Sequence, residues 1–187
     1  MPDDAFDPNR RATLEAAVRA AGLSPRGVVR LGPQDGIATL PDGRPAVSVL
    51  LVGWRGRDGW AAFAGSLERG DGRADPLDRW STRVIGELAE RFGGFAVFPF
   101  AGPPFRPFQR WGMRAEGLTA SPLGLSIDAE VGLWHGFRGA IVTTEDLGEE
   151  APTQASPCAS CVGRPCLSAC PANAFAATGY DVAACRG

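Results

Sequence analysis

The spacing of apolar side chains predicts helices in the first half of the chain. Over residues 7–22, Leu14, Val18 and Ala21 recur on one helical face. Asp7 is placed to cap the first turn, and a glycine can end the last turn. These signals together predict an amphipathic helix that packs one face against a core.

The clearest helical pattern covers residues 74–94. Asp75 is placed at the N-cap, a proline follows it in the first turn, and two glycines can end the helix. Five large side chains share one face and are expected to be buried: Leu77, Trp80, Val84, Leu88 and Phe92. Shorter helices are predicted over residues 58–68 and 107–115.

Runs of β-branched and aromatic residues between glycines and prolines predict strands. The predicted strands are residues 25–32, 46–53, 94–100, 121–128 and 132–144. Helices and strands alternate loosely, without the regular rhythm of βαβ units. The pattern therefore favours an α+β fold with a mixed or antiparallel sheet flanked by helices.

The cysteines divide the chain into two parts. All five lie in the last 30 residues, and the first 157 residues contain none. Residues 145–157 are acidic and then rich in proline and serine, which is typical of a linker. We therefore expect an α+β domain over residues 1–150 and a small cysteine module over residues 151–187.

Composition limits the functional classes. The net charge is −2, which gives no electrostatic reason to expect nucleic-acid binding. No apolar run approaches the roughly 20 residues needed to cross a bilayer, and the polar N-terminus lacks a signal-peptide core. We therefore expect a cytoplasmic protein without a membrane partner. Cysteines stay reduced in that compartment, and their odd number argues against a closed disulfide framework.

The cysteine run has the spacing C-x2-C-x4-C-x3-C-P, formed by Cys158, Cys161, Cys166 and Cys170. Bacterial ferredoxins use C-x2-C-x2-C-x3-C-P, so the run differs by two extra residues before its third cysteine. Zinc sites usually separate two cysteine pairs by about 12–20 residues, much further than here. The run therefore favours a [4Fe–4S] cluster, with structural zinc and unliganded or disulfide-bonded cysteines as the alternatives.

Cys185 leaves the number of clusters open. Two clusters need about eight thiolates, and the chain has five. Either four of the five hold one cluster, or a second run follows beyond Gly187. Asp181 is placed to cap a helix that begins just before the chain ends, which agrees with the second possibility.

Two resemblances extend this interpretation. Residues 157–185 resemble the ferredoxin-type module of epoxyqueuosine reductases and related corrinoid-dependent reductases, in which a C-P run precedes a Y-x-x-x-x-C segment. Tyr180 to Cys185 match that segment here. The resemblance implies [4Fe–4S] ligation by the cysteines. In that family a downstream run completes two clusters, and this sequence lacks such a run.

Residues 60–143 resemble cobalamin-processing proteins of the CblC type, which are related to flavin nitroreductases. The shared pattern is Gly-x-Trp, an aromatic residue and Arg-Gly before an apolar strand, matched here by Trp134 and Arg138. The resemblance implies a nitroreductase-like domain with these two residues near a corrinoid or flavin. The family's cobalamin-proximal histidine has no clear counterpart.

Three further features have a structural and a functional interpretation. His135, the only histidine, is more simply a satisfied core or surface residue than a ligand or an acid/base group. Residues 99–111 combine prolines, aromatic residues and arginines, as in a stiff loop covering the sheet or a shelf that stacks on a flat cofactor. The arginines at positions 106, 110 and 114 would share one helical face, either solvated or binding an anion.

Three functions follow from these observations. The first is a [4Fe–4S] electron-transfer protein that docks a redox partner protein. The second is a corrinoid- or flavin-dependent reductase in which the cluster relays electrons. The third is a globular protein stabilised by zinc.

Overall fold

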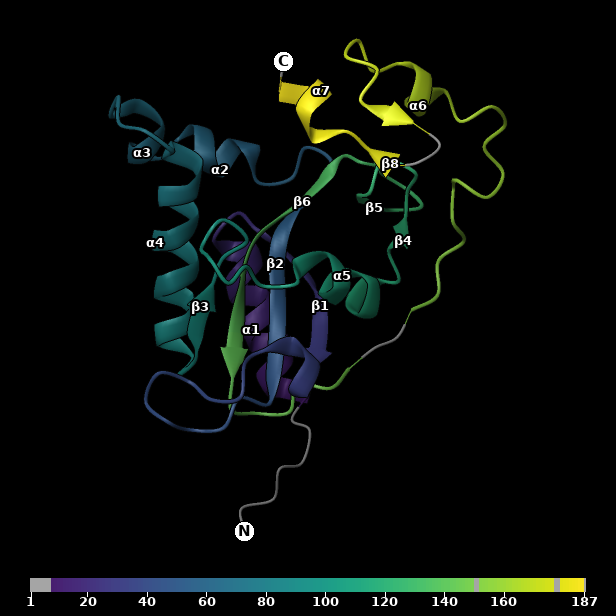
Figure 1. Ribbon diagram of the computed structural model, residues 1–187. Coiled ribbons are helices and arrows are strands. Elements are labelled where there is room, and N and C mark those ends of the chain that lie inside the picture. Colours follow the sequence, from purple (N-terminus) through teal and green to yellow (C-terminus); the bar gives the residue numbers. More distant parts are fainter. Residues whose placement is uncertain (1–7, 150–151, 177–178, 187) are drawn as a thin grey trace.

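The computed structural model describes residues 8–149, 152–176 and 179–186. Its centre is a four-stranded antiparallel sheet in the order β1-β2-β6-β3 (Figure 1). The bounds of these strands are β1 Ser24–Arg30, β2 Ser48–Arg55, β3 Phe95–Val97 and β6 His135–Thr143. The predicted α+β class and antiparallel sheet are thus confirmed.

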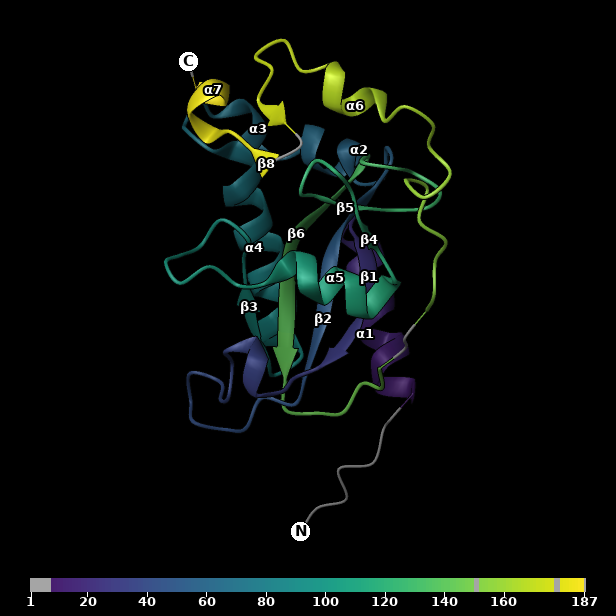
Figure 2. The same cartoon turned by 45° about the vertical axis from the view of Figure 1, so that its right-hand side comes forward.

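Helices cover both faces of this sheet (Figure 2). The longer helices are α1 (Pro8–Ala20), α4 (Pro76–Arg91) and α5 (Phe108–Glu116). Because side chains alternate along a strand, one face carries Val28, Leu50, Val52 and Ile141, which pack against α1 and α4. The other face carries Val29, Val49, Leu51, Ala140 and Val142, which pack against α5.

The two central strands are buried on both faces, which explains their continuous apolar sequence. From Ser48 to Gly53 every residue of β2 is buried, and the last five residues of β6 are buried as well. Such runs lack the alternation of apolar and polar residues that would show which face of the sheet each side chain occupies. Their register instead comes from pairing, with Leu50 opposite Ile141.

Two bulges interrupt the sheet near one end. In β6, Arg138 is the extra residue between Phe137, opposite Gly53, and Gly139, opposite Val52. In β1, the register shifts between Pro25 and Val28. Bulges change the direction in which side chains point. Arg26 lies within the bulge of β1 and Arg138 within the bulge of β6.

The helix predicted over residues 74–94 is confirmed, but two of its details differ. Asp75 occupies the N-cap position with a left-handed backbone, φ 50°, and its side chain makes no capping hydrogen bond. The buried face includes Ser81 and Ile85, whereas Leu77 and Val84 are only partly buried at its edge. The buried stripe is therefore turned by about one position from the predicted one.

Two other predictions are wrong in extent. Residues 58–68 form two short helices, α2 (Trp60–Ala64) and α3 (Leu67–Gly70). Residues 121–128 do not form a continuous strand, because a turn between Ser121 and Leu125 leaves only a two-residue pairing of β4 (Thr119–Ala120) with β5 (Ser126–Ile127).

Some predictions fall outside the described residues. They are the cap at Asp7 and the domain boundary between residues 150 and 151. In the part of the chain that the structure describes, no helix combines the length and apolar character needed to cross a membrane.

Candidate metal centre

A short extended segment joins the domain to the cysteine module. Within it, the Gln154 side chain donates from Nε2 to the Glu116 carbonyl (2.6 Å) and accepts from the Ala129 backbone N–H at Oε1 (2.9 Å). Gly117 lies beneath this segment with φ 69°, and a Cβ there would be 2.1 Å from the Pro152 carbonyl oxygen. One glutamine amide and one glycine therefore fix the start of the module against the end of α5.

The cysteine run follows as a series of tight turns. Gly163 and Arg164 both have positive φ, 75° and 42°, and reverse the chain before α6 (Pro165–Ser168). This single helical turn carries Cys166. Cys170 follows its C-cap residue, Ala169. A third residue with positive φ, Asn173, donates its backbone N–H to the Cys170 carbonyl at 3.0 Å. The backbone thus keeps the four cysteines within one small loop structure.

The fifth cysteine lies in the final helix. The strands β7 (Phe175–Ala176) and β8 (Gly179–Tyr180) form a hairpin, which is followed by α7 (Val182–Arg186). Asp181 accepts the backbone N–H groups of Ala183 and Ala184, so the predicted cap of this helix is confirmed. Cys185 occupies the exposed surface of α7.

Tyr180 connects Cys185 with the cysteine run. A hydrogen bond with Cys185 is the main cause that raises the pKa of the Tyr180 phenol, with partial desolvation as a smaller cause. Negative charge on Cys185 and Cys170 raises this pKa further, whereas Arg186 lowers it. The two cysteines therefore lie near the same hydroxyl, although 15 residues separate them in the sequence.

All five cysteines are free thiols: Cys161 and Cys185 are exposed, and the other three are partly exposed. Among the described residues, no three Cys, His, Asp or Glu side chains converge closely enough to hold a metal ion. A zinc ion would require four sulfurs at about 2.3 Å from one point. A four-iron cluster binds each thiolate at a different iron, so its sulfur ligands lie further apart than those of a zinc ion. The chemistry of the donor set, four free thiols in one loop structure, fits such a cluster.

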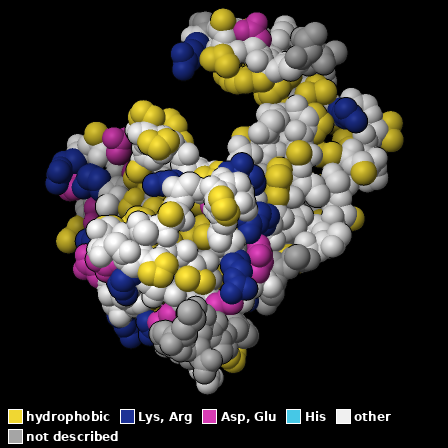
Figure 3. All heavy atoms as spheres, turned by 60° about the horizontal axis from the view of Figure 1, so that its bottom comes forward, with side chains coloured by type: hydrophobic (Ala, Val, Ile, Leu, Met, Phe, Trp, Pro, Cys, Tyr) yellow, Lys and Arg dark blue, Asp and Glu magenta, His cyan; other side chains and the backbone are white. Residues whose placement is uncertain are grey.

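The module lies over one end of the sheet. In both ribbon views, β8, α6 and α7 lie beyond the end of the sheet at which β6 begins (Figures 1 and 2). In the space-filling view, the module extends away from the domain, and hydrophobic side chains gather on its inner side (Figure 3). The domain contributes exposed apolar side chains at this end, namely Leu125, Leu133 and Trp134. A cavity of about 160 Å³ is lined in part by Leu125, Leu133, His135 and Phe137.

His135 is fully engaged in hydrogen bonds. Its Nε2 lies 3.0 Å from the Ser126 carbonyl, and its Nδ1 lies 3.5 Å from Nη2 of Arg26. A carbonyl can only accept, so the Ser126 contact requires a hydrogen on Nε2. Neither nitrogen is free to bind a metal ion, and the interpretation as a satisfied histidine agrees with this geometry.

Arg26 is the centre of a buried network that the sequence did not reveal. It is completely buried, and it donates to both carboxylate oxygens of Glu116 (2.6 Å each) and to the Trp54 carbonyl (2.6 Å). Its guanidinium also lies 5.0 Å from the centre of the Phe137 ring. In the sequence, the only indication that Arg26 is buried is its position in a predicted strand beside apolar residues. Its partner is 90 positions away.

Asp128 and Arg55 form a second buried contact at the same end. Burial alone raises the pKa of Asp128, but hydrogen bonds from the Val131 and Glu130 backbone and from Arg55 outweigh it, so the pKa is lowered. The Arg55–Asp128 contact measures 2.7 Å. These contacts hold the loop that leads into β6 beneath the module.

The two residues expected near a corrinoid or flavin lie in different surroundings. Trp134 is 80% exposed just before β6. Arg138, which the bulge aims toward α4, forms an ion pair with Asp78, donates to Ser81 Oγ at 3.1 Å, and lies 5.8 Å from the centre of the Phe100 ring. Arg138 therefore links β6 to α4. The Trp134 side chain is accessible to a binding partner.

Comparisons with known proteins add no family assignment. No protein-family model matches the chain, and no curated protein matches it.

Proposed function

We propose that the chain is a [4Fe–4S] electron-transfer protein whose cluster is bound by thiolates of the cysteine run. The observation that carries this proposal is the set of four free thiols, Cys158, Cys161, Cys166 and Cys170, in one turn-rich module. When bound, the cluster would supply one-electron transfer. The module extends from the domain, and a redox partner protein could approach its outer side (Figure 3).

Cys185 belongs to the same candidate site. Its inclusion is supported by Tyr180, because Cys185 and Cys170 both raise the pKa of that phenol. The thiolate is the form of cysteine that binds iron. The ligands of a single cluster would therefore be four of these five thiolates.

Anaerobic purification of the full chain with iron and sulfide assays tests this function. We expect about four irons and four sulfides per chain, together with a broad visible absorption that dithionite bleaches. At least three of C158S, C161S, C166S and C170S should lower the iron content, because at most one of the run's cysteines can be replaced as a ligand by Cys185. The control S160A, within the same run, should not lower it. One zinc per chain without colour would refute the proposal and support the zinc-stabilised protein.

A reductase is the second candidate, because the domain presents exposed apolar side chains to the module. Leu125, Leu133 and Trp134 are exposed at that end, and the first two line the small cavity. At about 160 Å³ this cavity is smaller than typical small-molecule sites, so a corrinoid or flavin would lie between domain and module. The CblC- or nitroreductase-like arrangement of the domain is part of this second proposal. Bound cobalt or a flavin spectrum in the purified protein would favour it, and Trp134→Ala should then weaken cofactor binding.

A further inference from the structure

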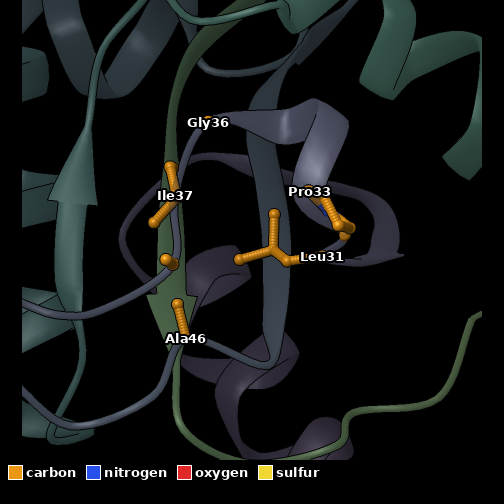
Figure 4. Close-up of a pocket in the computed structure, with 7 residues that line it drawn as sticks. Leu31, Pro33, Gly36, Ile37 and Ala46 are labelled. Atoms are coloured by element: carbon orange, nitrogen blue, oxygen red, sulfur yellow. The ribbon is translucent and has the colours of Figure 1, made fainter.

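An apolar cavity lies at the opposite end of the sheet from the cysteines. Its volume is about 430 Å³, within the range of small-molecule sites. Leu31 and Pro33 line one side, and Ile37 and Ala46 line the other (Figure 4). Water gains little in such an apolar space, so an apolar ligand would be favoured there.

One wall of this cavity is the turn η1 (Pro33–Asp35) with its flanking glycines, and it is held rigidly. Asp35 is 2% exposed and accepts hydrogen bonds from the Gly32 backbone N–H (2.9 Å) and from Trp111 Nε1 (2.8 Å). Burial alone raises the pKa of Asp35, but these hydrogen bonds and the contact with Arg114 lower it overall. The wall is therefore present without a ligand.

The arginines spaced four apart in the sequence all reach this turn. Arg114 is neutralised, because it pairs with Asp35 (3.0 Å) and Glu149 (3.1 Å). Arg106 donates to the Gly36 carbonyl (2.6 Å) and Arg110 to the Gln34 carbonyl (2.7 Å).

The charges of Arg106 and Arg110 are not compensated. Neither of these guanidinium groups has a carboxylate partner among the residues that the structure describes. Gly36 lines the cavity, so the Arg106 charge lies at its wall, and Arg106 also lines a neighbouring cavity of about 290 Å³. Arg110 is bonded to Gln34, the residue that follows Pro33 of the cavity lining. An apolar cavity with one uncompensated positive charge at its wall and a second on the adjoining turn is complementary to a ligand with an apolar chain and an anionic head.

We propose that this cavity binds an aliphatic carboxylate, with the chain between Leu31 and Ile37 and the carboxylate at Arg106 and Arg110. Guanidinium groups are suited to carboxylates, because their N–H groups can pair with both oxygens. Each methylene that enters the cavity should strengthen binding about three- to fourfold. This site is independent of the cysteines and of the function proposed for them.

Calorimetric titration of the full chain with saturated carboxylates of increasing length tests the proposal. Affinity should rise by about tenfold for every two carbons from hexanoate to decanoate, with one site per chain. Decanol, which has the chain without the charge, should bind at least about tenfold more weakly than decanoate, and inorganic phosphate should not compete.

Variants locate the site. R106Q/R110Q should weaken decanoate binding by about tenfold or more, whereas R57Q/R69Q, which removes the same charge from exposed positions elsewhere, should not. A38W should block the cavity from its exposed side, and the arginine comparison alone decides if A38W does not fold. The proposal is overturned if decanoate fails to bind at millimolar concentration, if decanol binds equally well, or if R106Q/R110Q behaves like the control.

Discussion

The buried pair of Arg26 and Glu116 allows a quantitative test of the network beneath the module. Arg26 is 0% exposed and Glu116 is 14% exposed, so the two partners are not equivalent. The variant E116L removes the carboxylate and leaves a guanidinium without water or a counter-charge. The variant R26M leaves a carboxylate that can still reach solvent.

The expected magnitudes follow from this asymmetry. Removing one partner of a buried ion pair costs about 3–5 kcal/mol, so E116L should lower the free energy of unfolding by that amount. For a chain of this size, the melting temperature should fall by roughly 8–15 °C. R26M should cost about half as much or less, because Glu116 keeps contact with water. The double variant R26M/E116L should recover most of the loss, because buried ion pairs are often replaceable by apolar side chains.

Urea denaturation of the four proteins at neutral pH, followed by circular dichroism, measures these differences. The reasoning depends on the order of the two single variants and on recovery in the double variant. It would be refuted if R26M were the more damaging single change, or if the double variant lost the sum of both single losses. Additive losses would mean that each side chain stabilises the fold through separate contacts.

Three further predictions concern other parts of the molecule. Gly117→Ala should destabilise the fold by more than about 1 kcal/mol, because Gly117 has a positive φ and lies close to the Pro152 carbonyl. The variant should also be cleaved faster by proteases in the linker, and an unchanged cleavage rate would contradict this. Asp35→Asn should flatten the dependence of stability on pH below about pH 4. The folded-state pKa of Asp35 is lowered, so its ionised form stabilises the fold above its ordinary value of 3.8, and this contribution is lost as pH falls through the folded pKa. Acid titration by circular dichroism would show parallel curves for both proteins if this is wrong. Ile141→Ala, at a position that is 0% exposed, should cost about 2–5 kcal/mol in urea denaturation, and a smaller loss would indicate that the core closes around the change.

The sequence predicted the elements whose pattern is local. The helix at residues 74–94 and the strand at residues 46–53 are both present near their predicted bounds, because helix caps, apolar periodicity and β-branched runs are properties of neighbouring residues. The buried face of that helix differs by one position from the predicted one, and the buried Ser81 on it accepts a hydrogen bond from Arg138, a partner 57 positions away.

The remaining features depend on contacts that are distant in sequence. The order of the strands places β6 between β2 and β3, and nothing in the local pattern of any of these strands encodes that neighbour. The bulge at Arg138 and the burial of Arg26 arise only once the sheet is paired. For the candidate metal centre, the spacing identified four cysteines, whereas the effect of both Cys170 and Cys185 on the pKa of Tyr180 required the fold.

The hydrogen bonds of Gln154 have a consequence for how freely the thiols can move. By chain length alone, the 11 residues from the buried Leu147 to Cys158 could span about 38 Å. With Gln154 held at Glu116 and Ala129, only four residues remain, and Cys158 stays within about 14 Å of that anchor. The volume accessible to the thiol shrinks by roughly twentyfold, so its effective concentration near the end of the sheet rises by the same factor. A single amide side chain thereby converts a long tether into a short one.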